Sequence, residues 1–148
     1  RRQRQMCIRD RFDIGQTSPK QDVAWMKSFM SIKDQLDFKF IFCLEGKCIS
    51  TNLYWAMSSN SVCVMPKPKY ESWFMEGKLE NGVHYIEVKD DFSDAREKIK
   101  FYNNNNDKCL EIIYNAQKFV KQFKNVKQER LIQLLILKQY FQSTGQNG

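Results

Sequence analysis

Three short runs of almost uninterrupted apolar residues restrict the fold of this chain more than any other feature. They lie at 38–44, 61–65 and 83–88. A strand that is apolar at nearly every position suits a parallel sheet, in which both faces are buried. Polar segments with helical periodicity separate the runs, as the crossover connections of parallel strands require. The sequence therefore predicts an α/β fold, a Rossmann-like parallel sheet with helices on both faces.

Helical segments are expected between and after these runs. They are predicted at 22–37, 50–59, 69–79, 95–102, 109–123 and 126–141, and the last of them form a C-terminal helical region. Ser31 and Asp34 have the spacing of a capping pair, so a second short helix is expected to begin there. Asparagines at 103–106 interrupt the C-terminal helices, because asparagine is a poor helix former that tolerates left-handed turns. Residues 12–20 are predicted to form a short strand and a loop.

Length and charge indicate one domain with a basic tail. The chain has 148 residues and a net charge of +7, and residues 1–11 hold five arginines against one acid. We expect 1–11 to be a disordered or non-native tail and 12–148 to be the folded domain. No apolar run approaches the roughly 18–20 residues of a membrane span. The sequence begins with arginine rather than methionine, and we expect it to be part of a longer protein.

The cysteines and the single histidine argue against a metal site. Five cysteines occur without the close pairs that zinc and redox motifs need. Cys43 and Cys63 lie in apolar runs, where a free thiol behaves as a small hydrophobe, so free thiols and a reducing, cytoplasmic location are expected. His84 stands alone and has no neighbouring nucleophile in the sequence, which favours a structural role for it.

The segment 44–52 is the first candidate for chemistry. A buried strand ends there, Gly46 turns the chain, and Ser50, Thr51 and Asn52 begin a predicted helix. Ligands of open α/β sheets bind beyond the carboxyl ends of strands, and the N–H groups at a helix start attract anions. Ser50 or Thr51 is the expected N-cap. An ordinary strand–turn–helix explains the pattern equally simply, because no standard phosphate-loop motif is present.

The second candidate is the segment 65–77, in which polar and aromatic residues alternate after the second apolar run. Such a loop can stack a base on an aromatic ring and bind a ribose through a carboxylate. Tyr70, Glu71 and Trp73 are the candidate residues. The competing interpretation is that the aromatic residues belong to the core and that Glu71 is merely solvated.

Seven short blocks of this sequence resemble glycosyltransferase family 90, and they occur in the same order as in that family. The blocks are LEG (44–46), TNL (51–53), SNS (59–61), MPKP (65–68), WFMEG (73–77), HY (84–85) and DDFSD (90–94). The resemblance is strongest to the bacterial branch that modifies lipopolysaccharide, and it runs from about residue 12 to residue 146. Related animal enzymes are protein O-glucosyltransferases and O-xylosyltransferases.

The resemblance implies a fold and an activity. Members have two Rossmann-like halves with the active site between them (the GT-B architecture), and this chain resembles only the C-terminal half, which binds the nucleotide-sugar donor. The catalytic base belongs to the other half, so no catalytic residue is expected here and the chain alone is expected to be inactive. The donor is expected to be a UDP-sugar, and the acceptor a lipopolysaccharide or another glycan. Members need no metal or other cofactor.

The resemblance also assigns residues. Gly46, Ser50, Thr51 and Asn52 are expected to face the diphosphate of the donor. Tyr70, Glu71 and Trp73 are expected to lie near its base or ribose. Animal members have an arginine at the position of Asn52, so this chain lacks a cation there, and Lys47 is the alternative source of positive charge.

A different class of function competes with this one. A non-enzymatic basic α/β module would bind nucleic acid or an anionic membrane through its arginine-rich residues 1–11. The resemblance favours the transferase, and no nucleic-acid partner is then expected. The expected location is the cytoplasm, peripheral to the inner face of the bacterial inner membrane.

Overall fold

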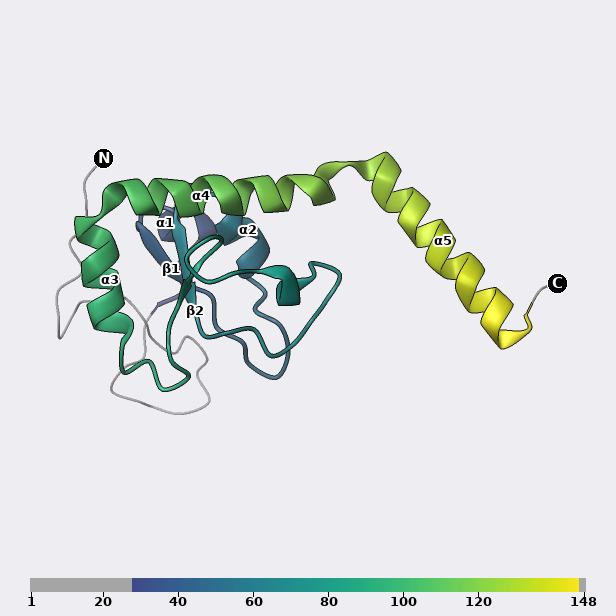
Figure 1. Ribbon diagram of the computed structural model, residues 1–148, viewed down its shortest axis with the longest axis horizontal. Coiled ribbons are helices and arrows are strands. Elements are labelled where there is room, and N and C mark those ends of the chain that lie inside the picture. Colours follow the sequence, from purple (N-terminus) through teal and green to yellow (C-terminus); the bar gives the residue numbers. More distant parts are fainter. Residues whose placement is uncertain (1–27, 147–148) are drawn as a thin grey trace.

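A three-stranded parallel sheet organises the part of the chain that the computed structural model describes, residues 28–146 (Figure 1). The strands are β1 (Phe40–Phe42), β2 (Val62–Met65) and β3 (Ile86–Glu87), and they lie side by side in sequence order. β2 pairs in parallel with β1 and with β3. The predicted parallel arrangement of the three apolar runs is therefore confirmed, with strands shorter than expected.

Helices precede, connect and follow the strands. In chain order they are α1 (Ile32–Gln35), α2 (Leu53–Met57), the 3-10 turn η1 (Glu76–Lys78), α3 (Ala95–Asn104), α4 (Asn106–Lys121), the 3-10 turn η2 (Gln122–Lys124) and α5 (Val126–Thr144). The predicted interruption by asparagines is confirmed but narrow, because Asn105 alone separates α3 from α4.

Both faces of the sheet are buried, because alternate strand residues point to opposite sides. On one face the strands pack against α2, the 74–79 segment and the end of α4, through the buried residues Ile41, Cys43, Cys63, Met65, Tyr85, Leu53, Ala56, Met57, Phe74, Leu79, Ala116 and Val120. On the other face they pack against α3 and the start of α4, through Phe40, Val62, Val64, Ile86, Val88, Ala95, Cys109 and Ile112. The predicted cover of helices on both faces is therefore present.

Helix α4 belongs to both layers and closes the end of the sheet at which the strands begin. Its side chain Gln117 donates from Nε2 to the carbonyl oxygen of Ser59 at 2.8 Å and to Oδ1 of Asn60 at 3.1 Å, just before β2. Ser61 Oγ donates to the carbonyl oxygen of Phe38 at 2.7 Å, which joins the starts of β2 and β1. These bonds tie α4 and the starts of β1 and β2 together at this end of the sheet.

Two predicted helices are largely wrong. Residues 28–31 of the predicted 22–37 helix are not helical, and residues 22–27 lie outside the described part, as do the 12–20 strand and the 1–11 tail. Ser31 has extended geometry and caps α1, since its Oγ accepts from the N–H of Asp34 at 3.2 Å. The capping pair is thus confirmed, and it starts a new helix instead of continuing one.

The predicted 69–79 helix is reduced to η1. Met75 has a left-handed backbone with φ of 56°, which a helix does not allow, and the prolines at 66 and 68 offer no N–H group. Similarly, the 83–88 strand is shortened because Gly82, with φ of 75°, turns the chain before it. These turns order the loops around the sheet.

The cysteines of the described segment are free thiols, and Cys43 and Cys63 are buried side by side in the core. A hydrogen bond with Cys63 and burial raise the pKa of Cys43 well above its usual value, so this thiol is protonated at neutral pH. Both act as small apolar residues of the core. Cys7 lies outside the described residues.

Shortening a buried side chain of the sheet is expected to destabilise the protein. Ile86 is fully buried, and Ile86→Ala is expected to lower the free energy of unfolding by about 2–5 kcal/mol through lost apolar burial and the cavity left behind. Ile136 on α5 is 52% exposed, and Ile136→Ala is expected to change it by less than about 0.5 kcal/mol. Urea denaturation of the 148-residue chain measures both, and equal effects would contradict this packing.

Candidate functional site

The loops that leave the carboxyl ends of the three strands are joined by side chains. Glu45, after β1, accepts hydrogen bonds from the backbone N–H groups of Lys69 at 3.1 Å and Tyr70 at 3.3 Å, after β2. The ammonium of Lys69 in turn pairs with Asp90, after β3, at 2.9 Å. The three loops therefore form one surface, called here the carboxyl edge.

The carboxyl edge carries solvent-exposed charged groups of both signs. The side chains of Lys69 and Asp90 are 61% and 66% exposed. The carboxylate of Asp90 raises the pKa of Lys69, so this side chain is a cation at neutral pH. An ion pair this exposed contributes little to stability, so a bound anion can compete with Asp90 for the lysine.

Asn52 and Ser50 hold the loop after β1 in place. The Asn52 amide donates from Nδ2 to the carbonyl oxygen of Phe42 at 2.8 Å, and its Oδ1 accepts from Ser50 Oγ at 2.6 Å. The expected helix cap at Ser50 or Thr51 is wrong, because Asn52 occupies the N-cap position of α2 and makes no side-chain cap bond. With these bonds made, Ser50 and Asn52 act as supports of the loop.

Gly46 and Thr51 are the accessible members of the predicted diphosphate set. Thr51 is exposed, and no atom lies within 4 Å of the place where a Cβ on Gly46 would be. The N–H of Gly46 already bonds to the carbonyl oxygen of Cys48 at 3.2 Å. Because α2 has only five residues, its dipole adds little, and the hydroxyl and backbone groups of the loop are the main polar groups here.

The residues predicted to bind the base or ribose are only partly brought to this edge. Tyr70 is 46% exposed, and its backbone N–H donates to Glu45 in the loop after β1. Glu71 lies against Gly77, with Oε1 3.2 Å from the place of a Cβ there. Trp73 instead donates from Nε1 to Glu129 of α5 at 2.7 Å.

Glu76 orders the loop after β2, and this role of Glu76 was not predicted from the sequence. Its carboxylate is buried and accepts hydrogen bonds from the N–H of Ser72 at 2.6 Å and from Ser72 Oγ at 2.7 Å. The Ser72 hydroxyl also accepts from the N–H of Phe74 at 3.1 Å. An acidic residue between Met75 and a glycine looks solvated in the sequence, so nothing in the pattern signals its burial.

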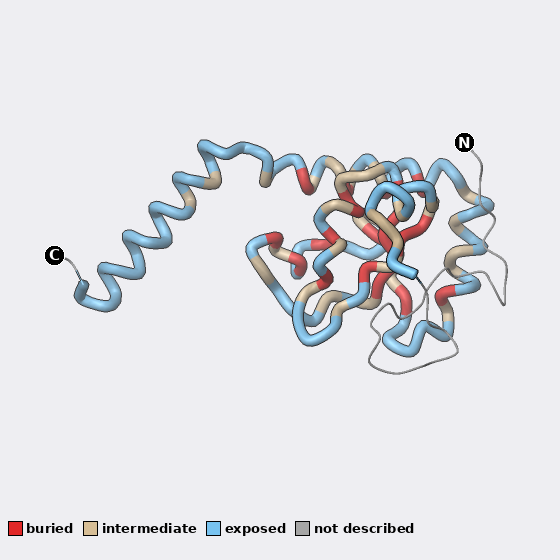
Figure 2. The backbone as a smooth tube through the Cα atoms, turned by 180° about the vertical axis from the view of Figure 1, so that it is seen from behind, coloured by how far each residue is buried: buried red, intermediate tan, exposed pale blue. Residues whose placement is uncertain are grey.

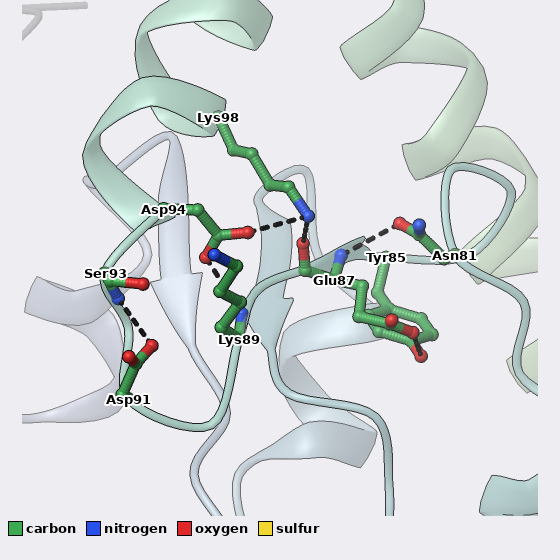
Figure 3. A network of polar contacts seen from close by, with 8 residues as sticks. All are labelled: Asn81, Tyr85, Glu87, Lys89, Asp91, Ser93, Asp94 and Lys98. Atoms are coloured by element: carbon green, nitrogen blue, oxygen red, sulfur yellow. Dashed lines mark hydrogen bonds and ion pairs between the residues drawn. The ribbon is translucent and has the colours of Figure 1, made fainter.

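The loop after β3 is held by a polar network (Figure 3). The Lys98 ammonium contacts Asp94 at 3.0 Å and the carbonyl oxygen of Glu87 at 2.6 Å, while Asp94 accepts from the N–H of Lys89 at 2.8 Å. The bond from Lys89 is the main reason that the pKa of Asp94 is lowered. Asn81 Oδ1 accepts from the N–H of Glu87 at 3.0 Å. These side chains satisfy the polar groups of Glu87 on the outer edge of β3.

His84 packs against an aromatic ring and accepts a backbone hydrogen bond. Its ring packs against Phe119, with 5.3 Å between centroids, and its Nδ1 accepts from the backbone N–H of Glu80 at 3.1 Å. Burial lowers its pKa, against the opposing charge of Glu80. The next residue, Tyr85, donates its hydroxyl to Glu87 at 2.9 Å, and burial raises the pKa of Tyr85 above its usual value.

Residues 28–146 contain no group of three or more His, Cys, Asp or Glu side chains that could hold a metal ion. None of the described helices is both long and apolar enough to cross a membrane.

Comparison of the sequence with known proteins shows which family and which proteins it is similar to. The family model described as Glycosyl transferase family 90 matches residues 12–142. The O-glucosyltransferase LpsA of Dichelobacter nodosus is 46% identical over 115 residues, which are 78% of this chain and 36% of that protein. Uncharacterized protein 179R of Invertebrate iridescent virus 6 is 31% identical over 98 residues, or 62% of this chain and 8% of that protein. The chain thus spans about a third of the bacterial relative.

Loss of the Asn52 hydrogen bonds is expected to lower the stability of the protein. Asn52→Ala removes the bond to the carbonyl oxygen of Phe42 and leaves Ser50 without its acceptor, so the free energy of unfolding is expected to fall by about 1–3 kcal/mol. Thr51→Ala, the neighbouring exposed change, is expected to alter it by less than about 0.5 kcal/mol. Chemical denaturation separates the two, and a harmless Asn52→Ala would refute this role.

His84 predicts a pH dependence of stability. Because folding lowers its pKa, the unfolded chain binds the proton more readily, and stability present above about pH 6.5 is lost as the pH falls through the lower folded pKa. His84→Asn keeps an acceptor for the Glu80 N–H but does not titrate, so its stability is expected to stay flat from pH 7 to about pH 5. Denaturant midpoints across this range provide the measurement, and equal slopes for both proteins would contradict the prediction.

Proposed function

The chain belongs to glycosyltransferase family 90, and on this premise we propose that it is the donor-binding part of a glycosyltransferase. The donor is a nucleotide-sugar of the UDP class, and the acceptor is lipopolysaccharide or another glycan. The name of the Dichelobacter relative, an O-glucosyltransferase, favours glucose as the sugar. In this proposal the chain forms the C-terminal half of a GT-B enzyme, which works in the cytoplasm at the inner face of the membrane.

The joined carboxyl edge is the observation on which the proposal depends. Ligands of open α/β sheets bind beyond the carboxyl ends of the strands. Here Glu45 and Lys69 connect all three loops at that end, while Gln117 of α4 bonds to the segment before β2 at the other end. A donor that spans the edge would meet the first loop with its diphosphate and the second loop, at Tyr70, with its base.

The residues of this chain bind and orient the donor in the proposed mechanism. The Thr51 hydroxyl and backbone N–H groups near Gly46 donate to diphosphate oxygens, with Ser50 and Asn52 holding the loop. Lys69, released from Asp90, or the exposed Lys47 offsets the charge that develops on the leaving diphosphate. The groups that deprotonate the acceptor belong to another part of the protein, so the 148-residue chain binds donor and transfers no sugar.

Titration with uridine diphosphate tests the site. Amide shifts of the 148-residue chain are expected to cluster at 45–53 and 69–75. A charge-assisted hydrogen bond contributes about 1.5–3 kcal/mol, so Thr51→Ala together with Asn52→Ala is expected to weaken binding about tenfold or more. Thr51→Ala alone, which spares the loop, is expected to weaken it in the same direction. Thr144→Ala, on α5, is the control and leaves binding unchanged.

Two results of that titration would refute the proposal. One is the absence of shifts at millimolar ligand, and the other is a set of shifts confined to α3, α4 and α5. Sugar transfer by the isolated chain would refute its inactivity.

The competing function, a basic binding module, is separated by deleting residues 1–11. These residues lie outside the described part of the chain and hold five of its arginines. Binding to phosphate backbones or anionic vesicles through this arm would disappear with it and would fall steeply with salt. Binding of uridine diphosphate by residues 12–148 would persist.

A further inference from the structure

Two side chains of opposite charge meet where the loops after β2 and β3 approach each other. The ammonium of Lys69 lies 2.9 Å from the carboxylate of Asp90, and both side chains are more than half exposed. Around them the chain is exposed, in contrast to the buried strand β2 (Figure 2). The pair is therefore open to a ligand that arrives from the solvent.

The backbone of Lys69 is held in place although its side chain is exposed. Both carboxylate oxygens of Glu45 accept from the N–H of Lys69, at 3.2 and 3.1 Å. Glu45 immediately precedes Gly46, where the candidate diphosphate site begins. The bond thus fixes the base of the Lys69 side chain beside the loop after β1, whereas the ammonium at its tip can exchange one anionic partner for another.

Asp90 differs from two other acids of the same loop. Asp91 accepts a hydrogen bond from the N–H of Ser93 at 3.0 Å. Asp94 accepts one from the N–H of Lys89 at 2.8 Å (Figure 3). These two carboxylates order the loop after β3. Asp90 reaches across to the loop after β2 instead, so its release leaves the bonds that order its own loop intact.

A diphosphate at this edge is stabilised by a nearby cation, because its oxygens carry negative charge. The side chains of Ser50, Thr51 and Asn52 in the loop after β1 are neutral, and those of Ser50 and Asn52 are bonded to each other at 2.6 Å. Lys69 brings a positive charge to the same edge. A diphosphate carries more than one negative charge and the Asp90 carboxylate only one, so the diphosphate attracts the ammonium more strongly.

From these contacts we propose that Lys69 binds the diphosphate of the nucleotide and that Asp90 competes with this diphosphate for the Lys69 ammonium. The inference rests on the proposed function, because it takes the carboxyl edge as the nucleotide site. When the nucleotide binds, Lys69 exchanges Asp90 for phosphate oxygens. When the product nucleoside diphosphate leaves, Asp90 takes its place again. Asp90 thereby lowers the affinity for donor and product alike and favours release of the product.

The size of the effect follows from how often the Lys69 ammonium is free. A ligand that needs the free ammonium binds with an apparent Kd equal to its intrinsic Kd divided by the free fraction. An exposed pair that leaves the ammonium free about a third of the time raises the Kd about threefold. Asp90→Asn removes the competing charge and is therefore expected to strengthen the binding of uridine diphosphate about threefold. Lys69→Met is expected to weaken it about tenfold.

Calorimetric titration of the 148-residue chain with uridine diphosphate provides the test. Asp91→Asn is the matched control, since it removes the same charge one position along the loop and its amide oxygen can still accept from Ser93. Its Kd is expected to change by less than about twofold, because water and salt screen an exposed charge. In the Lys69→Met background, Asp90→Asn is expected to lose its effect, because no ammonium remains for which Asp90 can compete.

The ion pair itself is tested without a nucleotide. The hydrogen bond and the charge of Asp90 raise the pKa of Lys69, so Asp90→Asn is expected to lower this pKa. An NMR titration of the chain with isotope-labelled lysine side chains measures it, and an unchanged pKa would contradict the pairing.

Three results of the calorimetry would overturn the inference and leave the proposed function in place. They are equal affinities of the wild type and Asp90→Asn, an equal gain from Asp91→Asn, and a gain from Asp90→Asn that persists without Lys69. The last two would reveal a general effect of net charge. Absence of uridine diphosphate binding by every variant would refute the proposed function itself, and this inference with it.

Discussion

Burial of both faces of a small parallel sheet is the constraint from which the rest of the structure follows. Residues of β2 are buried at every position, so helices must cover both sides and the connections must run from one strand end to the other. All three strands then end at the same edge. The loops that meet there present polar groups, and Glu45 and Lys69 join these loops into one surface.

The sequence predicted the features that depend on local pattern. Apolar runs identified the three strands and their parallel order, and the Ser31–Asp34 spacing identified a helix start. It did not predict contacts between residues far apart in the chain. The Asn52 amide binds the carbonyl of Phe42, and Glu45 binds the backbone near Tyr70, and neither contact has a local signature. The irregular conformation of 69–79 was not predicted because it depends on the buried Glu76 carboxylate.

The structure brings only some of the predicted site residues together at the carboxyl edge. Gly46 and Thr51 remain accessible, whereas Ser50 and Asn52 are occupied in holding the loop. Trp73 instead donates a hydrogen bond to Glu129 of α5. In the proposed function, another part of a longer enzyme completes the site, and no catalytic base is assigned to this chain.

Photo-crosslinking tests whether the carboxyl edge binds a nucleotide-sugar, because it identifies the residues that contact the ligand. A uridine diphosphate analogue with an azide on the base is irradiated with the 148-residue chain, and the modified peptide is sequenced by mass spectrometry. Modification is expected within 69–73, and excess uridine diphosphate is expected to suppress it. Modification confined to α3, α4 or α5, or labelling that excess uridine diphosphate does not suppress, would contradict it.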